Sequence, residues 1–254
     1  MISIKSERDL KVMRDACVIA ATVLDELCQM ARDGISTWEL DQAAKKIMEG
    51  HSCRSASYKY KCGSLRYPGY VCLSVNDEII HGIGSKDKVL KRGDIISMDV
   101  CVVYQGFVGD NTRTVVIGEA APEVLRLVES TERALHVGIS NALAGNRVGD
   151  ISSSIQKFVE DAGYSVIREF TGHGVGKRLH EEPEVPNYGR AGTGPVLRPG
   201  MTLAIEPMVA MGGPEIRMGA DGWTVYTADG LPSSHSEHTI LITDGEPEIL
   251  TVRK

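Results

Sequence analysis

The sequence predicts an α+β protein in which helices cover a curved, mainly antiparallel β-sheet. In residues 90–112, an apolar run leads into an aspartate, a Gly-containing turn follows, and a second apolar run carries another aspartate, which predicts a β-hairpin. In addition, each half of the 254-residue chain reads as a long helix, a shorter helix and then strands that carry a carboxylate. We therefore expect one domain over residues 1–254, built from similar halves at about 1–118 and 119–254.

Composition narrows the class of protein. Charged residues make up 24% and hydrophobic residues 42% of the chain, which is ordinary for a globular protein. The net charge of −6 gives no reason to expect DNA as a ligand. We also expect no membrane partner, because no apolar run reaches spanning length and residues 1–30 do not read as a signal peptide. Six cysteines without a C-x-x-C pair favour reduced thiols in a cytoplasmic protein.

Two helices are expected in the first half. A capping pattern at Ser6 and apolar residues at spacings of three and four predict a helix to about residue 32. A capping box at Ser36 and Glu39 predicts a second helix, which ends at Gly50. After an irregular segment over 51–70, we expect a strand at 71–76 and a loop at 79–82 that carries His81.

The second half opens in the same way. Pro122 suits the first position of a helix, and an apolar stripe continues this helix to about residue 145. Asp150 is expected to cap the next helix, which Gly163 closes. No polar linker separates the two halves, so we expect them to share one core.

Asp99 and Asp110 lie in the predicted hairpin. If Gln105 and Gly106 form a two-residue loop, position 99 faces position 112, whereas a shifted loop makes it face position 110. Both registers place the two carboxylates on one face, because side chains alternate along a strand. Like charges so placed destabilise a sheet unless a cation lies between them. The alternative is two solvated aspartates on a polar face.

Glu206 lies in a second copy of the pattern around Asp99. After both Leu90 and Leu197, a glycine follows three residues later and a carboxylate follows six residues after the glycine. Asp99 and Glu206 therefore occupy the same place in two copies of one unit. This repetition predicts two similar halves whose carboxylates meet at the junction between them.

His173 and Glu237 are the other candidate ligands. His173 stands among glycines that leave its ring uncrowded, in a spacing unlike that of a dinucleotide-binding loop. Taken alone, Glu237 reads as a carboxylate at a strand edge. Four carboxylates and one imidazole suit Mn(II), Fe(II) or Co(II), and so many negative charges suit two ions. His81 and His180 can hydrogen-bond to a substrate, although each alone also fits a surface or core histidine.

The order of these motifs resembles the type I methionine aminopeptidases, which are pita-bread metallopeptidases. The resemblance runs almost end to end and rests on His81-Gly82, Asp99, Asp110-Asn111-Thr112, residues 171–176 around His173, His180-Glu181-Glu182-Pro183, Glu206-Pro207 and residues 236–239 around Glu237. Agreement with this family in particular rests on Tyr67-Pro68, Val71-Cys72 and residues 221–224 around Trp223. The chain also has no room for the large N-terminal domain usual in prolidases and aminopeptidases P, or for the insertion of type II enzymes.

The resemblance implies a pita-bread fold and removal of the initiator methionine from nascent polypeptides with a small second residue. It implies five ligands to two divalent ions (Fe²⁺, Mn²⁺ or Co²⁺): Asp99, Asp110, His173, Glu206 and Glu237. Asp110 and Glu237 match bridging ligands, and Glu206 also matches the proton shuttle. His81 matches a residue that contacts the scissile amide, and His180 matches one near the scissile carbonyl oxygen.

The resemblance further implies a methionine pocket lined by Tyr67, Cys72 and Trp223. It also implies a monovalent cation near Ser97, Val100 and Ser233, a monomeric state, and contact with the ribosome near the exit tunnel. Many relatives carry aromatic residues where Ser64 and Leu179 stand, so we expect a looser pocket wall in this chain. Two alternatives remain, namely an Xaa-Pro aminopeptidase or dipeptidase of the same fold and a binding protein without catalysis.

Overall fold

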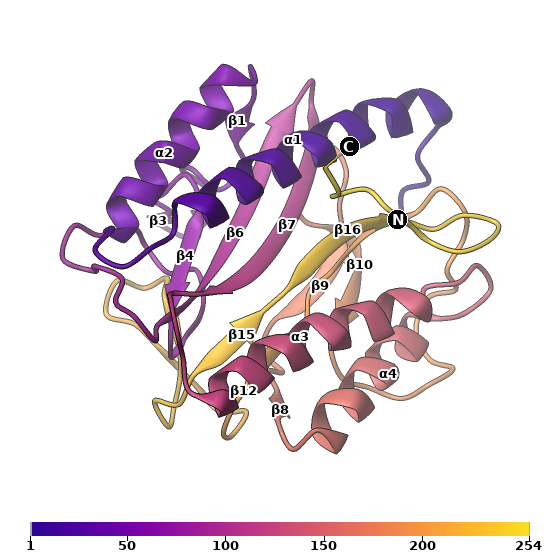
Figure 1. Cartoon of the computed structure of the whole chain (residues 1–254). Helices are drawn as coiled ribbons and strands as arrows, with labels where there is room; N and C mark the ends of the chain where they lie inside the picture. The colour runs from indigo at the N-terminus through magenta and orange to yellow at the C-terminus, as the bar shows by residue number, and fades with distance from the viewer. Residues whose placement is uncertain (1, 254) are drawn as a thin grey trace.

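The computed structural model describes residues 2–253. Its helices are α1 (Glu7–Met30), α2 (Thr37–Gly50), α3 (Pro122–Ser140) and α4 (Val148–Asp161). The strands of the first half are β1 (Arg54–Ser55), β2 (Lys61–Cys62), β3 (Leu65–Arg66), β4 (Cys72–Val75), β5 (Glu78–Ile80), β6 (Ile95–Tyr104) and β7 (Phe107–Val116). Those of the second half are β8 (Ser165–Val166), β9 (Thr171–Gly174), β10 (Glu181–Pro186), β11 (Thr202–Ile205), β12 (Met208–Ala210), β13 (Ile216–Met218), β14 (Val225–Thr227), β15 (Ser233–His235), β16 (Glu237–Leu241) and β17 (Glu248–Ile249). Figure 1 shows their arrangement.

Three of the helices begin where the capping signals predict. The Ser6 hydroxyl accepts a hydrogen bond from the Asp9 N–H at 3.2 Å, which satisfies one of the free N–H groups at the start of α1. The Ser36 hydroxyl does the same for the Glu39 N–H at 3.3 Å at the start of α2. Helix α3 begins at Pro122, whose missing N–H costs nothing at that position.

Helix α4 begins earlier than expected, so the prediction that Asp150 is its capping residue is wrong. The helix starts at Val148, and Arg147 has the extended backbone of the preceding residue. Asp150 is instead the third helical residue, and its carboxylate accepts a hydrogen bond from the Arg147 N–H at 2.7 Å. A carboxylate stabilises the start of a helix both at the capping position and at the third helical position. The sequence pattern therefore placed the capping residue three positions too late.

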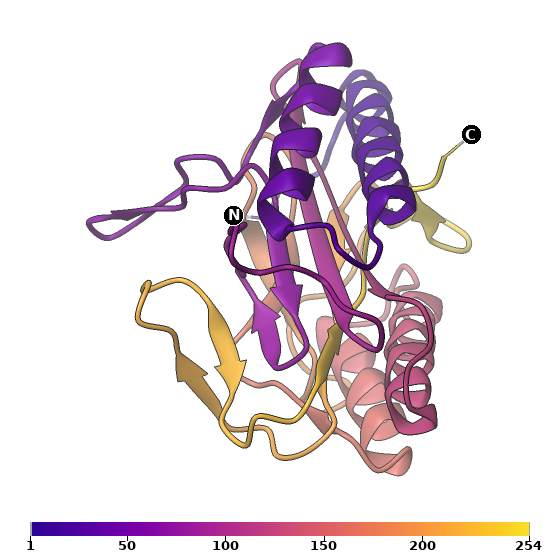
Figure 2. The ribbon, with the colours of Figure 1, turned by 60° about the vertical axis from the view of Figure 1, so that its left-hand side comes forward.

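A nine-stranded sheet joins the two halves. Its order is β1-β6-β7-β16-β11-β9-β10, with β4 also paired to β6 and β17 to β16. All strand pairs within residues 2–253 are antiparallel, which confirms the predicted sheet. The β7–β16 pair crosses from one half to the other. Figure 2 shows α1, α3 and α4 on one side of this sheet. Among the helices of residues 2–253, none is long and apolar enough to span a membrane.

The β6–β7 hairpin has the register that places residue 99 opposite residue 112. Gln105 (φ 47°) and Gly106 (φ 86°) form the two-residue loop, and both adopt the left-handed conformation that a tight hairpin turn requires. The alternative register is wrong, because Asp110 lies opposite Cys101. Asp99, Cys101 and Asp110 therefore share one face of the hairpin.

The repeated sequence pattern corresponds to repeated structure. Gly93 (φ 93°) and Gly200 (φ 86°) adopt the same left-handed backbone. The Gly93 N–H donates to the Ile117 carbonyl at 2.8 Å, and the Gly200 N–H donates to the Ile242 carbonyl at 2.9 Å. These equivalent turns lead into β6 and β11, which deliver the equivalent carboxylates to the centre of the sheet. The single domain and its division near residue 118 stay predictions.

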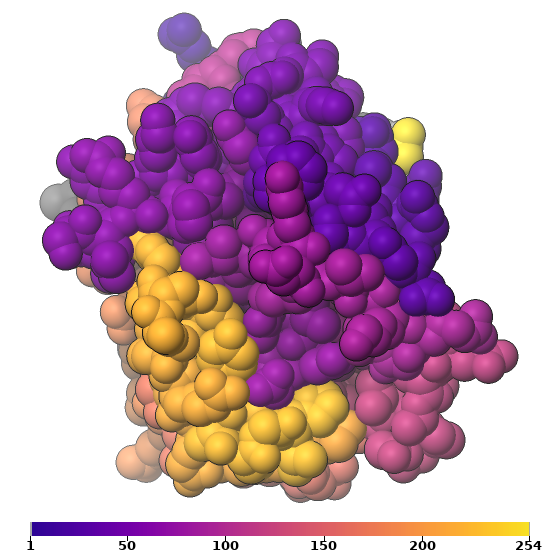
Figure 3. All heavy atoms as spheres, turned by 90° about the vertical axis from the view of Figure 1, so that its left-hand side faces the viewer, coloured from indigo at the N-terminus to yellow at the C-terminus, as the bar shows by residue number. Residues whose placement is uncertain are grey.

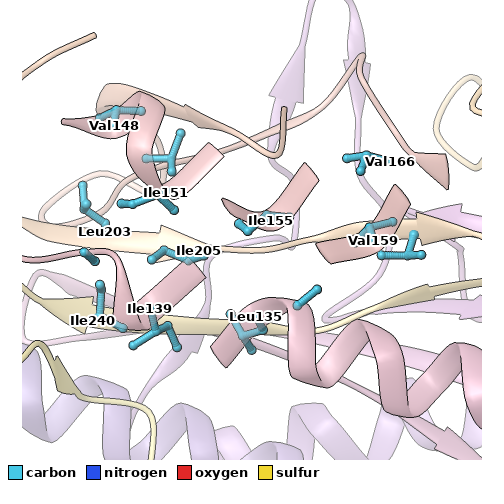
Figure 4. Close-up of a cluster of buried hydrophobic side chains, with 14 of the residues drawn as sticks. Leu135, Ile139, Val148, Ile151, Ile155, Val159, Val166, Leu203, Ile205 and Ile240 are labelled. Atoms are coloured by element: carbon cyan, nitrogen blue, oxygen red, sulfur yellow. The ribbon is translucent and has the colours of Figure 1, made fainter. Parts of the chain in front are cut away.

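Side chains along the central strands point alternately into the core beneath the helices and to the opposite face of the sheet. Met98 and Val100 of β6 are fully buried in a cluster with α1 and α2, whereas Asp99 and Cys101 point to the other face. The second half has its own apolar cluster beneath α3 and α4, which Figure 4 shows. Its labelled members are Leu135, Ile139, Val148, Ile151, Ile155, Val159, Val166, Leu203, Ile205 and Ile240. The helices thus bury one face of the sheet and leave the other available for polar chemistry.

One histidine on the helix-covered side should make stability depend on pH. His238 lies beside His136 of α3, and its Nδ1 is 2.8 Å from the Thr251 hydroxyl. Burial lowers the pKa of His238 to about 4, whereas the unfolded residue titrates near pH 6.5. Because the unfolded chain binds the proton more readily, the free energy of unfolding falls as the pH drops from about 6.5 towards 4.

Between pH 7 and pH 5, we expect the free energy of unfolding to fall by about 1–2 kcal/mol less in His238→Gln than in the wild-type protein. The glutamine can still hydrogen-bond to Thr251, and denaturant titrations at both pH values measure the difference. His51→Gln at the exposed end of α2 is the control. An unchanged pH difference in His238→Gln would contradict this prediction.

Candidate metal centre

All five predicted ligands line one cavity of about 240 Å³. They come from both halves: Asp99 from β6, Asp110 from β7, His173 from β9, Glu206 from the residue after β11, and Glu237 from β16. The pairing of β7 with β16 and of β11 with both β16 and β9 brings these strands side by side. Residues more than a hundred positions apart in the sequence therefore face one another.

The carboxylates of this cavity are buried and close together. Burial raises the pKa values of Asp110, Glu206 and Glu237 well above their usual range, and the neighbouring Asp99 raises all three further. One oxygen of Glu237, Oε1, has no hydrogen-bond partner among the described residues. No lysine or arginine within residues 2–253 lines the cavity. Buried carboxylates without a lysine or arginine beside them fit bound divalent cations. Such cations favour oxygen ligands, and their positive charge offsets the repulsion between the carboxylates.

His173 is prepared to act as a neutral ligand. Its Nδ1 donates a hydrogen bond to the Gly174 carbonyl at 2.9 Å, so the lone pair is on Nε2. That Nε2 lies 3.4 Å from Glu206 Oε1 and 3.8 Å from Asp110 Oδ2. Burial lowers the pKa of His173 to about 3 and keeps the ring neutral. A ring with one nitrogen hydrogen-bonded and the other free is the usual state of a metal-binding histidine.

Asp110 belongs to both groups of potential ligand atoms that the structure brings together. In one group, the ligand atoms of Asp110, His173 and Glu237 all lie within 4.8 Å of one another, and in the other the same holds for Asp99, Cys101 and Asp110. The Thr112 hydroxyl orients Glu237 by donating to its Oε2 at 2.8 Å. A carboxylate common to both groups is the natural residue to serve two metal ions.

His81 lies in a strained but well-supported turn. The expected loop over 79–82 is shorter than predicted, since β5 extends to Ile80 and pairs with β14. His81 adopts a left-handed backbone (φ 59°), which costs energy for a residue with a side chain. A Cβ on Gly82 would lie 2.3 Å from the Leu73 carbonyl oxygen, so this turn packs directly against β4. The Tyr67 hydroxyl also donates to the Gly82 carbonyl at 2.7 Å. These contacts hold the His81 ring in the cavity.

His180 lies next to His173, with ring centroids 4.4 Å apart. Its Nδ1 is 2.7 Å from the Tyr60 hydroxyl, and the Tyr60 ring meets the imidazole edge-on. Burial lowers the pKa of both His180 and His81, that of His81 to about 4, so both rings are neutral near pH 7. The next residue, Glu181, is held by a buried ion pair with Lys5 at 2.9 Å. Two neutral histidines therefore line the same cavity as the carboxylates.

An apolar compartment adjoins these polar groups. Tyr67, Cys72 and Trp223 form a buried cluster, in which the rings of Tyr67 and Trp223 meet edge-on at 5.3 Å. All three residues line the cavity, as does Leu179. Four of the residues that the sequence analysis associated with the substrate pocket, Tyr67, Cys72, Leu179 and Trp223, therefore lie together.

The expected effect of Ser64 on the pocket wall is wrong. Ser64 lies in the exposed turn between β2 and β3, a hairpin that projects from the body beside residues 210–230 (Figures 2 and 3). At the base of this hairpin the Tyr67 N–H donates to the Tyr60 carbonyl at 2.9 Å. Tyr60 and Cys62 line the cavity in place of Ser64. Within the segment expected to be irregular, β2 and β3 form a short hairpin that carries Ser64 at its turn, away from the cavity.

Sequence reasoning also missed Cys101 and His235. Cys101 faces the cavity two residues after Asp99. His235 is buried, and its Nε2 lies 3.4 Å from Glu206 Oε2 without another hydrogen-bond partner among the described residues. A signal existed for Cys101, because it stands two residues after Asp99 on the same strand and so on the same face. His235 ends β15 whereas Glu237 begins β16, so no such signal existed for it.

The expected monovalent-cation residues do not form one cluster of side chains. The Ser97 hydroxyl bonds to that of Thr114 at 2.8 Å, whereas Val100 is buried on the helix-covered face. The Ser233 N–H donates to the Asn76 carbonyl at 2.9 Å. This cation site stays a prediction.

Similarity to known proteins agrees with this geometry. Residues 11–244 match the model of metallopeptidase family M24. The chain is 44% identical to a methionine aminopeptidase of Clostridium acetobutylicum and 44% identical to methionine aminopeptidase 1 of Bacillus subtilis, with 99% of each chain covered in both cases. A crystal structure of methionine aminopeptidase from Thermotoga maritima superposes with a TM-score of 0.95 at 42% identity and full coverage of both chains.

A prolidase from Pyrococcus horikoshii shares the fold at a TM-score of 0.78, with 24% identity over 99% of this chain and 64% of that chain. These similarities confirm the expected pita-bread fold. The chain belongs to metallopeptidase family M24 and, within it, to the methionine aminopeptidases.

Proposed function

We propose that this chain removes the N-terminal methionine from newly made polypeptides whose second residue is small, acting as a cytoplasmic monomer. The observation that carries the proposal is one cavity in which buried carboxylates, a neutral histidine ligand and an apolar compartment adjoin. The relatives named methionine aminopeptidase support it over their whole length. We also expect the chain to meet its substrates at the ribosome, near the exit of the nascent chain.

The proposed ligands of two divalent ions are Asp99, Asp110, His173, Glu206 and Glu237, with Asp110 and Glu237 shared between the ions. Fe(II), Mn(II) and Co(II) all suit this donor set. Ions held there would supply an activated water molecule and polarise the scissile carbonyl. The proposal also includes a monovalent cation near Ser97, Val100 and Ser233.

Three side chains handle protons and charge in the proposed reaction. Glu206 accepts a proton from the attacking water and passes it to the leaving amine. In the tautomer that we propose, the Tyr60 hydroxyl, 2.7 Å from Nδ1 of His180, donates to that nitrogen, and the ring proton is on Nε2. His180 can then donate a hydrogen bond to the oxyanion that develops on the scissile carbonyl. His81, which lines the same cavity, hydrogen-bonds to the scissile amide.

The apolar compartment holds the methionine side chain. Tyr67, Cys72 and Trp223 form its buried wall, and Leu179 lines the same cavity. A pocket of this kind discriminates by about 1–3 kcal/mol for each methylene of misfit. We expect methionine to be the preferred first residue, and bulky second residues to clash at the mouth.

The test is an anaerobic assay of metal-reconstituted protein on Met-X-Gly peptides that vary in the second residue X. We expect cleavage when X is Gly, Ala, Ser, Thr, Pro, Val or Cys, restored by Fe(II), Mn(II) or Co(II) and abolished by a chelator. Cleavage of Ala-Pro-X but not of Met-Ala-X would instead establish an Xaa-Pro aminopeptidase. A protein that binds metal and cleaves neither class of peptide would be the non-catalytic alternative.

A further inference from the structure

Two cysteines flank Asp99 on the cavity face of the sheet. Cys72 of β4 is the direct partner of Asp99 in the antiparallel pair, and Cys101 follows Asp99 by two residues. Cys101 in turn lies opposite Asp110 of β7. Because side chains two residues apart or directly opposite share a face, two thiols and two carboxylates form one surface.

Cys101 is the thiol that lies among the carboxylate oxygens. Its Sγ is 3.2 Å from Asp99 Oδ1 and 2.9 Å from Asp110 Oδ1. The three residues can each offer a ligand atom within 4.8 Å of the others. Cys101 is only 5% exposed, and it lines the same cavity as Glu237, whose unpartnered Oε1 is also buried. An uncommitted buried oxygen beside this group is a further donor for a cation.

We propose that Cys101 is a sulfur ligand of the metal centre, which lets the centre bind thiophilic divalent cations such as Zn(II), Cd(II) and Co(II) through a metal–sulfur bond. Asp99 and Asp110 supply the oxygen ligands of the same ion. As the metal–sulfur bond forms, the S–H bond breaks and its proton passes to solvent. This inference rests on the proposed metal centre and adds a donor that the five proposed ligands do not include.

The chemical consequence is a change in metal preference. Carboxylate and imidazole ligands alone suit Mn(II) and Fe(II), whereas a thiolate favours softer ions. Cys72 is the internal comparison, because it belongs to the apolar cluster with Tyr67 and Trp223 rather than to the group of close ligand atoms. Of the two thiols, only Cys101 should bond to the metal.

The experiment is a Co(II) titration of metal-free protein under anaerobic conditions, followed by absorption spectroscopy. A cobalt–thiolate bond gives an intense sulfur-to-metal charge-transfer band in the near ultraviolet, whereas oxygen and nitrogen ligands give only weak visible bands. We expect the intense band in the wild-type protein and in Cys72→Ser and Cys62→Ser, the second of which removes the exposed thiol of the cavity. Cys101→Ser should lose this band and keep the weak ones.

A competition assay with a chelator gives a second readout. We expect the affinity of Cys101→Ser for Zn(II) to fall at least about 10-fold, since even an outer-shell change costs about 10- to 100-fold. If this variant does not fold, as judged by circular dichroism, Cys101→Ala replaces it.

The proposal is overturned if wild-type protein binds Co(II) without the charge-transfer band, or if the band survives in the Cys101 variants. Either result leaves the proposed aminopeptidase function intact. Failure of the wild-type protein to bind any of the tested metals would overturn both.

Discussion

Replacement of Asp110 by alanine should lower peptidase activity more than about 100-fold and weaken the binding of both metal ions. Asp110 contributes to both groups of potential ligand atoms, so we expect its loss to remove a donor from each of the two proposed ions. Loss of a residue that only supports a ligand already costs about 10- to 100-fold, and Asp110 should cost more. Its removal also lowers the negative charge that attracts the second ion.

The measurement combines kcat on a Met-Ala-Ser peptide with the number of metal ions bound per chain. Asp15→Ala, at an exposed position of α1, is the matched control and should keep both values. Near-normal turnover of Asp110→Ala would rule out a role for this carboxylate between the two ions. Loss of only one bound ion would assign it to a single ion.

Replacement of His180 by alanine should lower kcat by about 10²–10³ and leave the metal content unchanged, which is the effect of losing one hydrogen bond to a developing oxyanion. Tyr60→Phe keeps the ring beside His180 but removes the hydroxyl that lies 2.7 Å from its Nδ1. We expect a smaller fall in kcat with little change in KM, because fewer molecules then hold the proton on Nε2.

Tyr58→Phe is the control within the same segment. Tyr58 stacks on Tyr70 with ring centroids 4.4 Å apart and is not among the residues that line the cavity. Kinetic constants and metal content are measured for all three variants. If His180→Ala loses metal together with activity, His180 is a ligand and its proposed role as a donor is wrong.

Local signals in the sequence determined much of this architecture. Ser6 and Ser36 mark helix starts because their hydroxyls bond to N–H groups only three residues away. Gln105 and Gly106 define a hairpin because a two-residue turn needs left-handed backbone at both positions. The period of two along a strand then places Asp99 and Asp110 on one face without reference to the remainder of the chain. All of these features depend on residues that are near one another in the sequence.

Contacts between distant segments were decided only by the tertiary structure. Pairing of β7 with β16 brings Glu237 beside the hairpin, and no local signal specifies which strands will pair. The β2–β3 hairpin carries Ser64 out to solvent, although the family resemblance had placed it at the pocket wall. Tyr60 lies beside His180 instead. The approach of His235 to Glu206 likewise depends on how two separate strands lie. Such contacts form because burial of the shared core aligns the strands, and the free energy of that burial belongs to the whole fold rather than to any one segment.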